Sequence, residues 1–324
     1  MDKLKRYSRK LLKTILVLFV LLNIICAFHA YKLTHFYNRN EVTPKPEQMG
    51  FGDKLSAMFF GVKFPKVASL DTFSLHHETV ILKTEDSLKL EAWYAEYRQL
   101  NDFVKEAQGT VILFHGHGGK KNDVIREANS FYNLGYNVLL VDFRAHGNSE
   151  GNTCTVGFKE SKDVKAAYDY IVHKGEKNII LYGISMGAAT ILKSIEDNNV
   201  NPQKIILEMP FGTLHQAVKG RLKIMHLPQE PFANLLTFWG GTEQGFWAFN
   251  FKPEEYAKKV KCPTLLQWGT NDSRVSQDET ISILKNIGTN NKTFVEFKNS
   301  GHQSLCKNEN EKWQLAIETF LSSN

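Results

Sequence analysis

The pentapeptide Gly183–Gly187, which reads Gly-Ile-Ser-Met-Gly, constrains the fold more than any other segment of this 324-residue chain. The apolar run 177–182 before it predicts a buried parallel strand, and the small residues at 188–193 after it predict a helix. A strand that turns directly into a helix holds one residue in a strained conformation and leaves no room for side chains beside it. Gly183 and Gly187 have no side chains and so fit beside Ser185. The pattern therefore predicts a sharp turn that exposes the Ser185 hydroxyl at the top of a sheet.

The chain after Ser185 supplies an acid and then a histidine. Asp272 follows the strand predicted at 263–268, and His302 follows the strand predicted at 293–297. Both residues therefore fall at the carboxyl ends of strands, where open α/β sheets place their chemistry. His302 is also the only histidine after Asp272. We predict a catalytic triad in which Ser185 is the nucleophile, His302 is its base and Asp272 orients the histidine.

Two backbone N–H groups are candidates for stabilising an oxyanion. The N–H of Met186 follows the nucleophile and lies at the start of a predicted helix. The second donor is expected in the glycine-rich loop 115–119, which follows the strand predicted at 110–114. Glycines there allow the backbone to turn its N–H groups toward a substrate carbonyl, and His117 is the expected donor.

Other polar residues near the predicted site are interpreted as structural. Asp142 and Arg144 suit a role in bracing the loop under the nucleophile turn through ion pairs and hydrogen bonds. The histidines do not have the His-x-x-x-His spacing of metal ligands, and the cysteines do not have the Cys-x-x-Cys spacing. We therefore expect neither a metal nor a cofactor. The histidines considered as metal ligands are His115, His117, His146 and His302.

Predicted strands alternate with predicted helices from residue 78 onward. Such alternation gives a mostly parallel, doubly wound sheet, here preceded by an antiparallel pair. The predicted strands are 79–82, 88–95, 110–114, 137–142, 178–182, 204–208, 263–268 and 293–297.

About fifty residues, at 211–261, separate the strands predicted at 204–208 and 263–268. This connection is far longer than usual. The insertion is expected to form a helical lid, and its aromatic residues as a group suggest an apolar acyl pocket over Ser185. Cap helices with a small core of their own are the alternative. The aromatic residues are Phe232, Phe238, Trp239, Phe246, Trp247, Phe249 and Phe251.

The N-terminus predicts a membrane anchor. Residues 1–13 hold six basic residues and one acidic residue, which accounts for +5 of the net charge of +6, so the rest of the chain has no basic excess for nucleic acid. Residues 14–31 contain no charged side chain and span about 27 Å as a helix. A cleaved signal peptide is the alternative, although cleavage after Ala27 or Ala30 would place Ile25 or Phe28 where a small residue is preferred. We expect 1–13 in the cytoplasm and the catalytic domain across the membrane, after a juxtamembrane segment at 32–77.

Together these motifs resemble the α/β-hydrolase superfamily, and within it the membrane-anchored bacterial serine hydrolases of the serine aminopeptidase-like or monoacylglycerol-lipase-like group. The resemblance covers 78–324 and includes the segments 208–211 and 269–272. It implies the α/β-hydrolase fold, the same triad and the same two oxyanion donors. Many relatives carry histidine where Ile184 stands, which makes the turn more apolar here. The expected function is hydrolysis of carboxylic esters with acyl or lipid-like groups through an acyl-enzyme.

Several alternatives remain open at this point. A peptidase or amidase would need carboxylates in the lid to hold the substrate ammonium, and an acyltransferase would use the same triad. A non-catalytic binding module with the same fold is the rival outside enzymes. The sequence indicates neither the oligomeric state nor a disulfide among Cys154, Cys262 and Cys306. The lid carboxylates available to a peptidase are Glu230, Glu243, Glu254 and Glu255.

Overall fold

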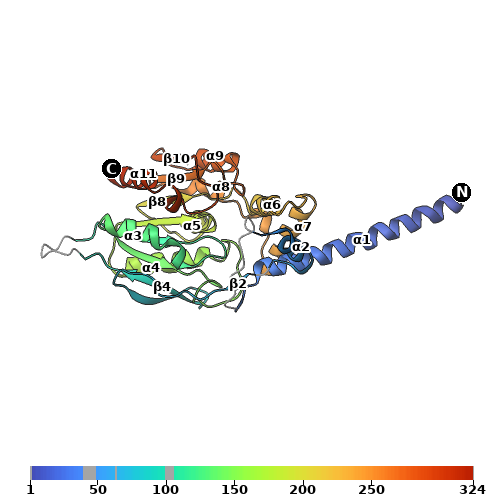
Figure 1. Ribbon diagram of the computed structural model, residues 1–324, viewed down its shortest axis with the longest axis horizontal. Coiled ribbons are helices and arrows are strands. Elements are labelled where there is room, and N and C mark those ends of the chain that lie inside the picture. The colour runs from blue at the N-terminus through green and yellow to red at the C-terminus, as the bar shows by residue number, and fades with distance from the viewer. Residues whose placement is uncertain (1, 39–48, 63, 99–105, 324) are drawn as a thin grey trace.

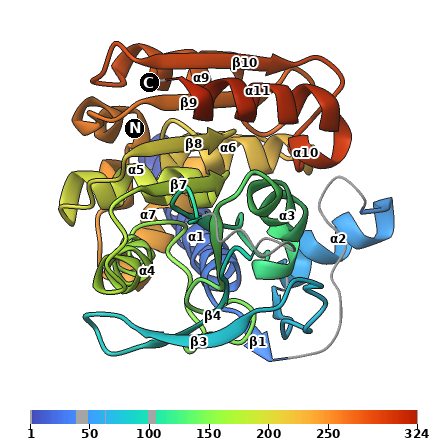
Figure 2. The same ribbon diagram turned by 90° about the vertical axis from the view of Figure 1, so that its left-hand side faces the viewer.

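The computed structural model describes the chain except for residues 1, 39–48, 63, 99–105 and 324. Its centre is an eight-stranded sheet with the strand order β10-β9-β8-β7-β5-β6-β4-β3 (Figure 2). β3 and β4 are antiparallel to their neighbours, and the other strands are parallel. The predicted sheet, including its leading antiparallel part, is therefore confirmed. The strands are β3 (Glu78–Lys83), β4 (Lys89–Ala95), β5 (Thr110–Phe114), β6 (Asn137–Val141), β7 (Ile179–Ile184), β8 (Lys204–Glu208), β9 (Thr264–Gly269) and β10 (Lys292–Phe297).

Helices cover both faces of the sheet because the central strands are apolar on both sides. In β5, Val111 and Leu113 join the core on one face, and Ile112 and Phe114 join the core on the other. α3 (Ile125–Asn133) and α11 (Asn310–Ser322) pack on the first face. The second face is covered by α4 (Ser161–His173), α5 (Met186–Asp197) and α9 (Gln277–Asn286). Two short helices, η2 (Lys121–Val124) and α10 (Leu305–Asn308), lie in connections.

The connection between β8 and β9 forms a helical insertion, which we call the lid. Its first helix begins after Thr213, whose hydroxyl accepts a hydrogen bond from the Gln216 N–H at 3.1 Å. The lid helices are α6 (Leu214–Ile224), α7 (Phe232–Gln244), η3 (Ala248–Asn250), α8 (Pro253–Tyr256) and η4 (Ala257–Lys259). Of these, α6 and α7 lie at the end of the domain where the N-terminal helix joins it (Figure 1).

The N-terminal segment is one long helix, α1 (Asp2–Thr34), and its first half extends away from the domain (Figure 1). Within it, Lys5–Thr34 is long and apolar enough to cross a membrane, by length and composition alone. The segment that follows contains α2 (Phe51–Phe60) and the parallel pair β1 (Tyr37–Asn38) and β2 (Pro65–Lys66).

Asp142 and Arg144 brace their loop, and each does so with a partner from elsewhere rather than with the other. The Asp142 carboxylate accepts hydrogen bonds from the Lys121 ammonium at 2.5 Å and from the Ser69 hydroxyl at 2.8 Å. The Arg144 guanidinium pairs with Asp163 at 2.6 Å and with Asp86 at 2.7 Å. Because Arg144 and Asp163 are both buried, each needs the other to offset its lost hydration.

Replacing Arg144 with Met leaves the buried Asp163 carboxylate without its cation. We expect the free energy of unfolding to fall by about 3–5 kcal/mol. The matched control is Lys165→Met, which removes one partner of the more exposed pair with Asp169 and should cost less than about 1 kcal/mol. Denaturant unfolding of both variants in detergent measures the difference, and equal losses would contradict this role for Arg144.

Candidate active site

The turn at Ser185 has the strained geometry that the pentapeptide predicts. β7 ends at Ile184, α5 begins at Met186, and Ser185 between them has φ 54° and ψ −110°. Its N–H donates a 2.7 Å hydrogen bond to the carbonyl of Glu208 on the neighbouring strand. A φ in this region is unfavourable for a side chain other than glycine, so the surrounding packing must hold it.

The two glycines beside Ser185 are required by close backbone approach. A Cβ on Gly183 would lie 2.6 Å from the N of Ala188. A Cβ on Gly187 would lie 2.5 Å from the carbonyl oxygen of Phe114 at the end of β5. Both distances are shorter than real Cβ contacts allow, so a larger residue at either position would push the turn off the sheet.

The predicted triad residues lie in one hydrogen-bonded chain. The Ser185 Oγ lies 2.9 Å from His302 Nε2, and His302 Nδ1 lies 2.7 Å from Asp272 Oδ2. An ionised carboxylate only accepts hydrogen bonds, so it places the imidazole proton on Nδ1. Nε2 is then free to accept the serine proton. The side chain of Asp272 is fully buried and that of His302 nearly so, which protects the pair from competing water.

The loop after β9 fixes the Asp272 carboxylate. Its Oδ1 accepts hydrogen bonds from the N–H groups of Arg274 at 2.7 Å and Val275 at 2.9 Å, while Oδ2 faces His302. The Asn271 N–H donates to the carbonyl of Ser300, which ties this loop to the one that carries His302. The acid and the base are thus placed by two loops that hold each other.

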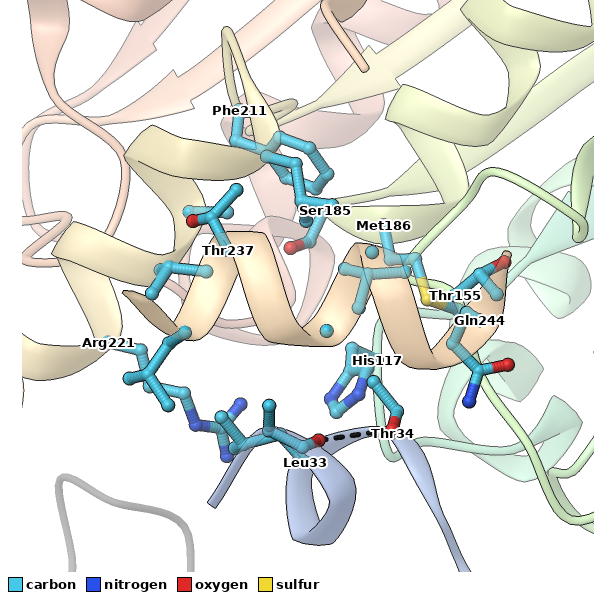
Figure 3. Close-up of a pocket in the computed structure, with 18 of the residues that line it drawn as sticks. Leu33, Thr34, His117, Thr155, Ser185, Met186, Phe211, Arg221, Thr237 and Gln244 are labelled. Carbon is cyan, nitrogen blue, oxygen red and sulfur yellow. Dashed lines mark hydrogen bonds between the residues drawn. The ribbon is translucent and has the colours of Figure 1, made fainter. Parts of the chain in front are cut away.

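The loop expected to supply the second oxyanion donor packs directly against the Ser185 turn. A Cβ on Gly116 would lie 3.6 Å from the Cβ of Ser185. His117 and Met186, the two predicted donors, line the same pocket as Ser185 (Figure 3). Burial, the dominant cause, lowers the pKa of His117 well below its usual value, and the charge of Arg221 lowers it further.

The neighbouring histidines hold this loop in place as neutral side chains. His146 accepts a hydrogen bond from the Gly118 N–H at 3.1 Å, and His115 accepts one from the Phe143 N–H at 3.2 Å. Each uses its other ring nitrogen on a backbone carbonyl. Burial lowers the pKa of His146 to about 3. These two histidines are therefore structural, and the orientation of the loop depends on them.

Two buried carboxyl groups lie beneath the His302 loop. Glu208 accepts a 2.6 Å hydrogen bond from the indole of Trp313, and Glu127 accepts one from Ser304, two residues after His302. Burial, followed by the proximity of Glu127, raises the pKa of Glu208 to about 8. Burial also raises the pKa of Glu127. Glu208 is therefore protonated in the folded protein at neutral pH.

The raised pKa of Glu208 predicts a pH-dependent stability. Its folded pKa of about 8 exceeds its ordinary value of 4.5, so the stability that protonation provides is complete below about pH 4.5 and lost as the pH rises toward 8. Glu208→Gln removes this dependence. Relative to the variant, the wild type should lose up to roughly 1 kcal/mol per pH unit between pH 5 and 8. Thermal unfolding across that range, with the exposed Glu311→Gln as control, measures it, and parallel profiles for wild type and Glu208→Gln would exclude this role.

The pocket over Ser185 is mostly apolar, but its lining differs from the expected aromatic one. Among the described residues, Phe246 is the only member of the predicted aromatic group that lines it. Phe251 is buried in the core, while Phe238 and Trp247 are substantially exposed. The lid contributes chiefly small and aliphatic residues, and two arginines add positive charge. The lid and loop residues are Leu214, Ala217, Val218, Arg221, Leu236, Thr237, Gly240, Gly241, Gln244, Phe246, Arg274 and Val275.

One wall of the pocket is not predicted by the sequence. Ala30, Leu33 and Thr34, near the end of α1, line it together with Ser185 and His302. Figure 3 shows Leu33 and Thr34 on the α1 ribbon across the pocket from Ser185. A membrane anchor alone accounts for the absence of charge in 14–31, and no residue there signals contact with an active site.

Known proteins resemble this chain in sequence and in fold. The serine aminopeptidase S33 family model matches residues 105–241, which include the turn at Ser185 and the loop with His117. The structure is similar to the esterase Pf2001 of Pyrococcus furiosus, with a TM-score of 0.66 and 23% identity over 80% of this chain and 98% of that one. The chain has the α/β-hydrolase fold, and part of it is similar to the serine aminopeptidase S33 family.

The sequence is also similar to known proteins of other organisms. It is 23% identical to protein bem46 of Schizosaccharomyces pombe, over 78% of this chain and 79% of that protein. It is also 23% identical to the lysophosphatidylserine lipase ABHD12 of Danio rerio, over 62% of this chain and 56% of the lipase. The relatives and structural neighbours thus include esterases and lipases, which supports hydrolase chemistry for this chain.

Proposed function

We propose that this protein is a serine hydrolase that cleaves carboxylic esters of acyl or lipid-like substrates through a covalent acyl-enzyme. The observation that carries the proposal is the hydrogen-bonded chain from Ser185 through His302 to Asp272, at 2.9 and 2.7 Å, at the base of an apolar pocket. A serine oxygen, a histidine and a buried carboxylate in this order are the parts that acyl transfer requires.

In the proposed mechanism, the Ser185 oxygen attacks the ester carbonyl carbon while His302 Nε2 takes the hydroxyl proton. The charge on the former carbonyl oxygen is stabilised by the N–H groups of His117 and Met186, each worth about 3–4 kcal/mol in related sites. Collapse of this intermediate breaks the bond to the alkoxy leaving group, which takes the proton from His302. Water then attacks the acyl-enzyme by the same steps and regenerates the free Ser185 hydroxyl.

The charges around the pocket favour esters over the substrates of an aminopeptidase. Among the described residues that line it, none is acidic, so none can hold a substrate ammonium. Three of the four lid carboxylates have other partners: Glu230 pairs with Lys219, Glu255 pairs with Lys258, and Glu254 accepts a hydrogen bond from Ser282. Arg221 and Arg274 line the pocket and would repel an ammonium.

The same two arginines favour acyl esters that carry an anionic group. A guanidinium presents several donors in a plane that matches a carboxylate or a phosphate. The ABHD12 relatives are lysophosphatidylserine lipases, and lysophosphatidylserine is an anionic acyl lipid. A single-chain anionic lipid therefore belongs in the substrate panel beside neutral esters.

We further propose that α1 anchors the protein in a membrane. Residues 1–13 would lie in the cytoplasm, 14–31 would span the bilayer, and the segment 32–77 would connect the anchor to a catalytic domain at 78–324 on the opposite side. The six basic residues before the span support this orientation, because positive charge is retained on the cytoplasmic side. The spanning length of α1 supports the anchor.

The direct test compares the full chain with Ser185→Ala and with Ser322→Ala, a control at an exposed serine far from the pocket. Substrates are p-nitrophenyl esters from acetate to palmitate, a monoacylglycerol, an anionic lysophospholipid and aminoacyl anilides. Ester turnover should fall by at least about 10³-fold in Ser185→Ala and remain unchanged in Ser322→Ala.

The other outcomes of this experiment decide between the remaining alternatives. Ester turnover that survives in Ser185→Ala would exclude the proposed nucleophile. Cleavage of anilides without cleavage of esters would favour the peptidase alternative. A folded wild type that turns over no substrate and does not react with a fluorophosphonate would favour the binding-module alternative.

A further inference from the structure

The last turns of α1 belong to the pocket as well as to the anchor. Ala30, Leu33 and Thr34 line the same cavity as Ser185 and His302. A spanning helix that served only as a tether would need no contact with the catalytic residues. The end of the proposed anchor therefore forms part of the pocket of the proposed site.

α1 is packed tightly on the lid at this end. Cys26 and Ala30 are each only 1% exposed and share a buried cluster with Leu222 of α6 and with Ala233 and Leu236 of α7. The small side chains of Cys26, Ala30 and Ala233 let the helices approach closely, as small residues do where helices meet in membranes. Any increase in size at Ala30 therefore acts on both the α1–α7 contact and the pocket.

Hydrogen bonds fix the position of α1 along and around its axis. The Trp239 indole of α7 donates to the Asn23 side chain at 3.1 Å, and Asn23 in turn donates to the carbonyl of Phe19. At the end of the helix, the carbonyl of Thr34 accepts a 2.8 Å hydrogen bond from the N–H of Cys154. Next to Cys154, Thr155 lines the pocket. The end of α1 that lines the pocket is thus held by α7 and by the segment that contains Cys154.

The opposite side of α1 and its surroundings are apolar and exposed. Ile24, Ile25 and Phe28 of α1 face outward. α2 adds an exposed apolar face beside it, and α7 and the following turn add Phe238 and Trp247; Figure 1 shows α2 and α7 at the point where α1 leaves the domain. The exposed side chains of α2 are Phe51, Leu55, Phe59 and Phe60. Exposed apolar side chains on α1, α2 and α7 near the proposed anchor suit contact with lipid.

We propose that Ala30 and Leu33 of α1 are specificity-determining residues, which set the length of acyl chain that the pocket accepts from a membrane-resident amphiphilic ester. The inference rests on the proposed ester hydrolysis and adds that the anchor forms part of the binding site. A substrate dissolved in the bilayer beside α1 would reach the pocket at the wall that α1 forms. The anchoring of the protein in the membrane would thus be linked to the class of substrate that it binds.

The test uses full-length protein in lipid nanodiscs and two substitutions of opposite effect. Ala30→Val narrows the pocket and should lower kcat/KM for the longest p-nitrophenyl esters by about 10-fold, the cost of accommodating one or two methyl groups. Leu33→Ala widens it and should move the optimum toward longer chains. The readout is the ratio of kcat/KM for the longest ester to that for the acetate ester, which should fall in Ala30→Val and rise in Leu33→Ala because the acetyl group is too short to meet this wall.

The matched controls make the same changes in size on parts of α1 that do not line the pocket. They are Ala27→Val and Leu21→Ala, the latter at an exposed position. Both should retain the chain-length profile of the wild type. The inference is overturned if the profiles of Ala30→Val and Leu33→Ala coincide with those of the controls.

A second measurement keeps the result interpretable if a variant loses its fold. The labelling rate of Ser185 by fluorophosphonates with short and long alkyl chains reports the pocket without turnover, and the short probe reports an intact site. Normal labelling by both probes in Ala30→Val overturns this inference alone. Absence of labelling in the wild type overturns the proposed function and this inference with it.

Discussion

The closeness of β5 to the start of α5 is the constraint on which the site depends. Gly187 lies so near the carbonyl oxygen of Phe114 that no Cβ fits between them, and this contact holds Ser185 at a φ of 54°. The strained turn lifts the serine hydroxyl out of the sheet toward His302. It also brings the loop after β5, with Gly116 and His117, against the serine. One close backbone contact therefore places the hydroxyl and both expected N–H donors.

The rest of the site is organised by burial and by loops that hold one another. His115 and His146 are neutral because burial lowers their pKa values, and as neutral groups they can accept hydrogen bonds from backbone N–H groups. Asp272 has both oxygens occupied, which fixes the imidazole of His302 in the tautomer that can accept a proton. Pre-organisation of this kind lowers the reorganisation that the reaction would otherwise require.

The sequence predicts the elements that depend on local patterns. Ser185, Asp272 and His302 can be selected from the sequence alone. The signals are the glycines on both sides of Ser185, the apolar strands and the residues that follow β9 and β10. These side chains meet because the carboxyl ends of parallel strands lie along one edge of a sheet. The partners of Asp142 and Arg144 could not be predicted, since Lys121 and Asp163 approach them only through tertiary packing.

The pocket wall on α1 was unpredictable for a different reason. A long uncharged helix satisfies the requirements of a membrane span at every position, so the burial of Ala30 against the lid leaves no pattern in the sequence. The sequence could not show that most aromatic residues of the lid lie outside the pocket, for a similar reason. Large apolar side chains stabilise a small core or a membrane-facing surface as readily as a pocket, and Phe251 and Trp247 illustrate the two cases.

The proposed mechanism requires Ser185 to carry the acyl group during turnover. Full-length protein is mixed with excess p-nitrophenyl ester and quenched with acid, and its peptides are mapped by mass spectrometry. We expect an added acyl mass on the peptide that contains Ser185, formed at the rate of the p-nitrophenol burst. An acyl group on a different residue, or rapid turnover with no acylated peptide, would exclude Ser185 as the acyl carrier.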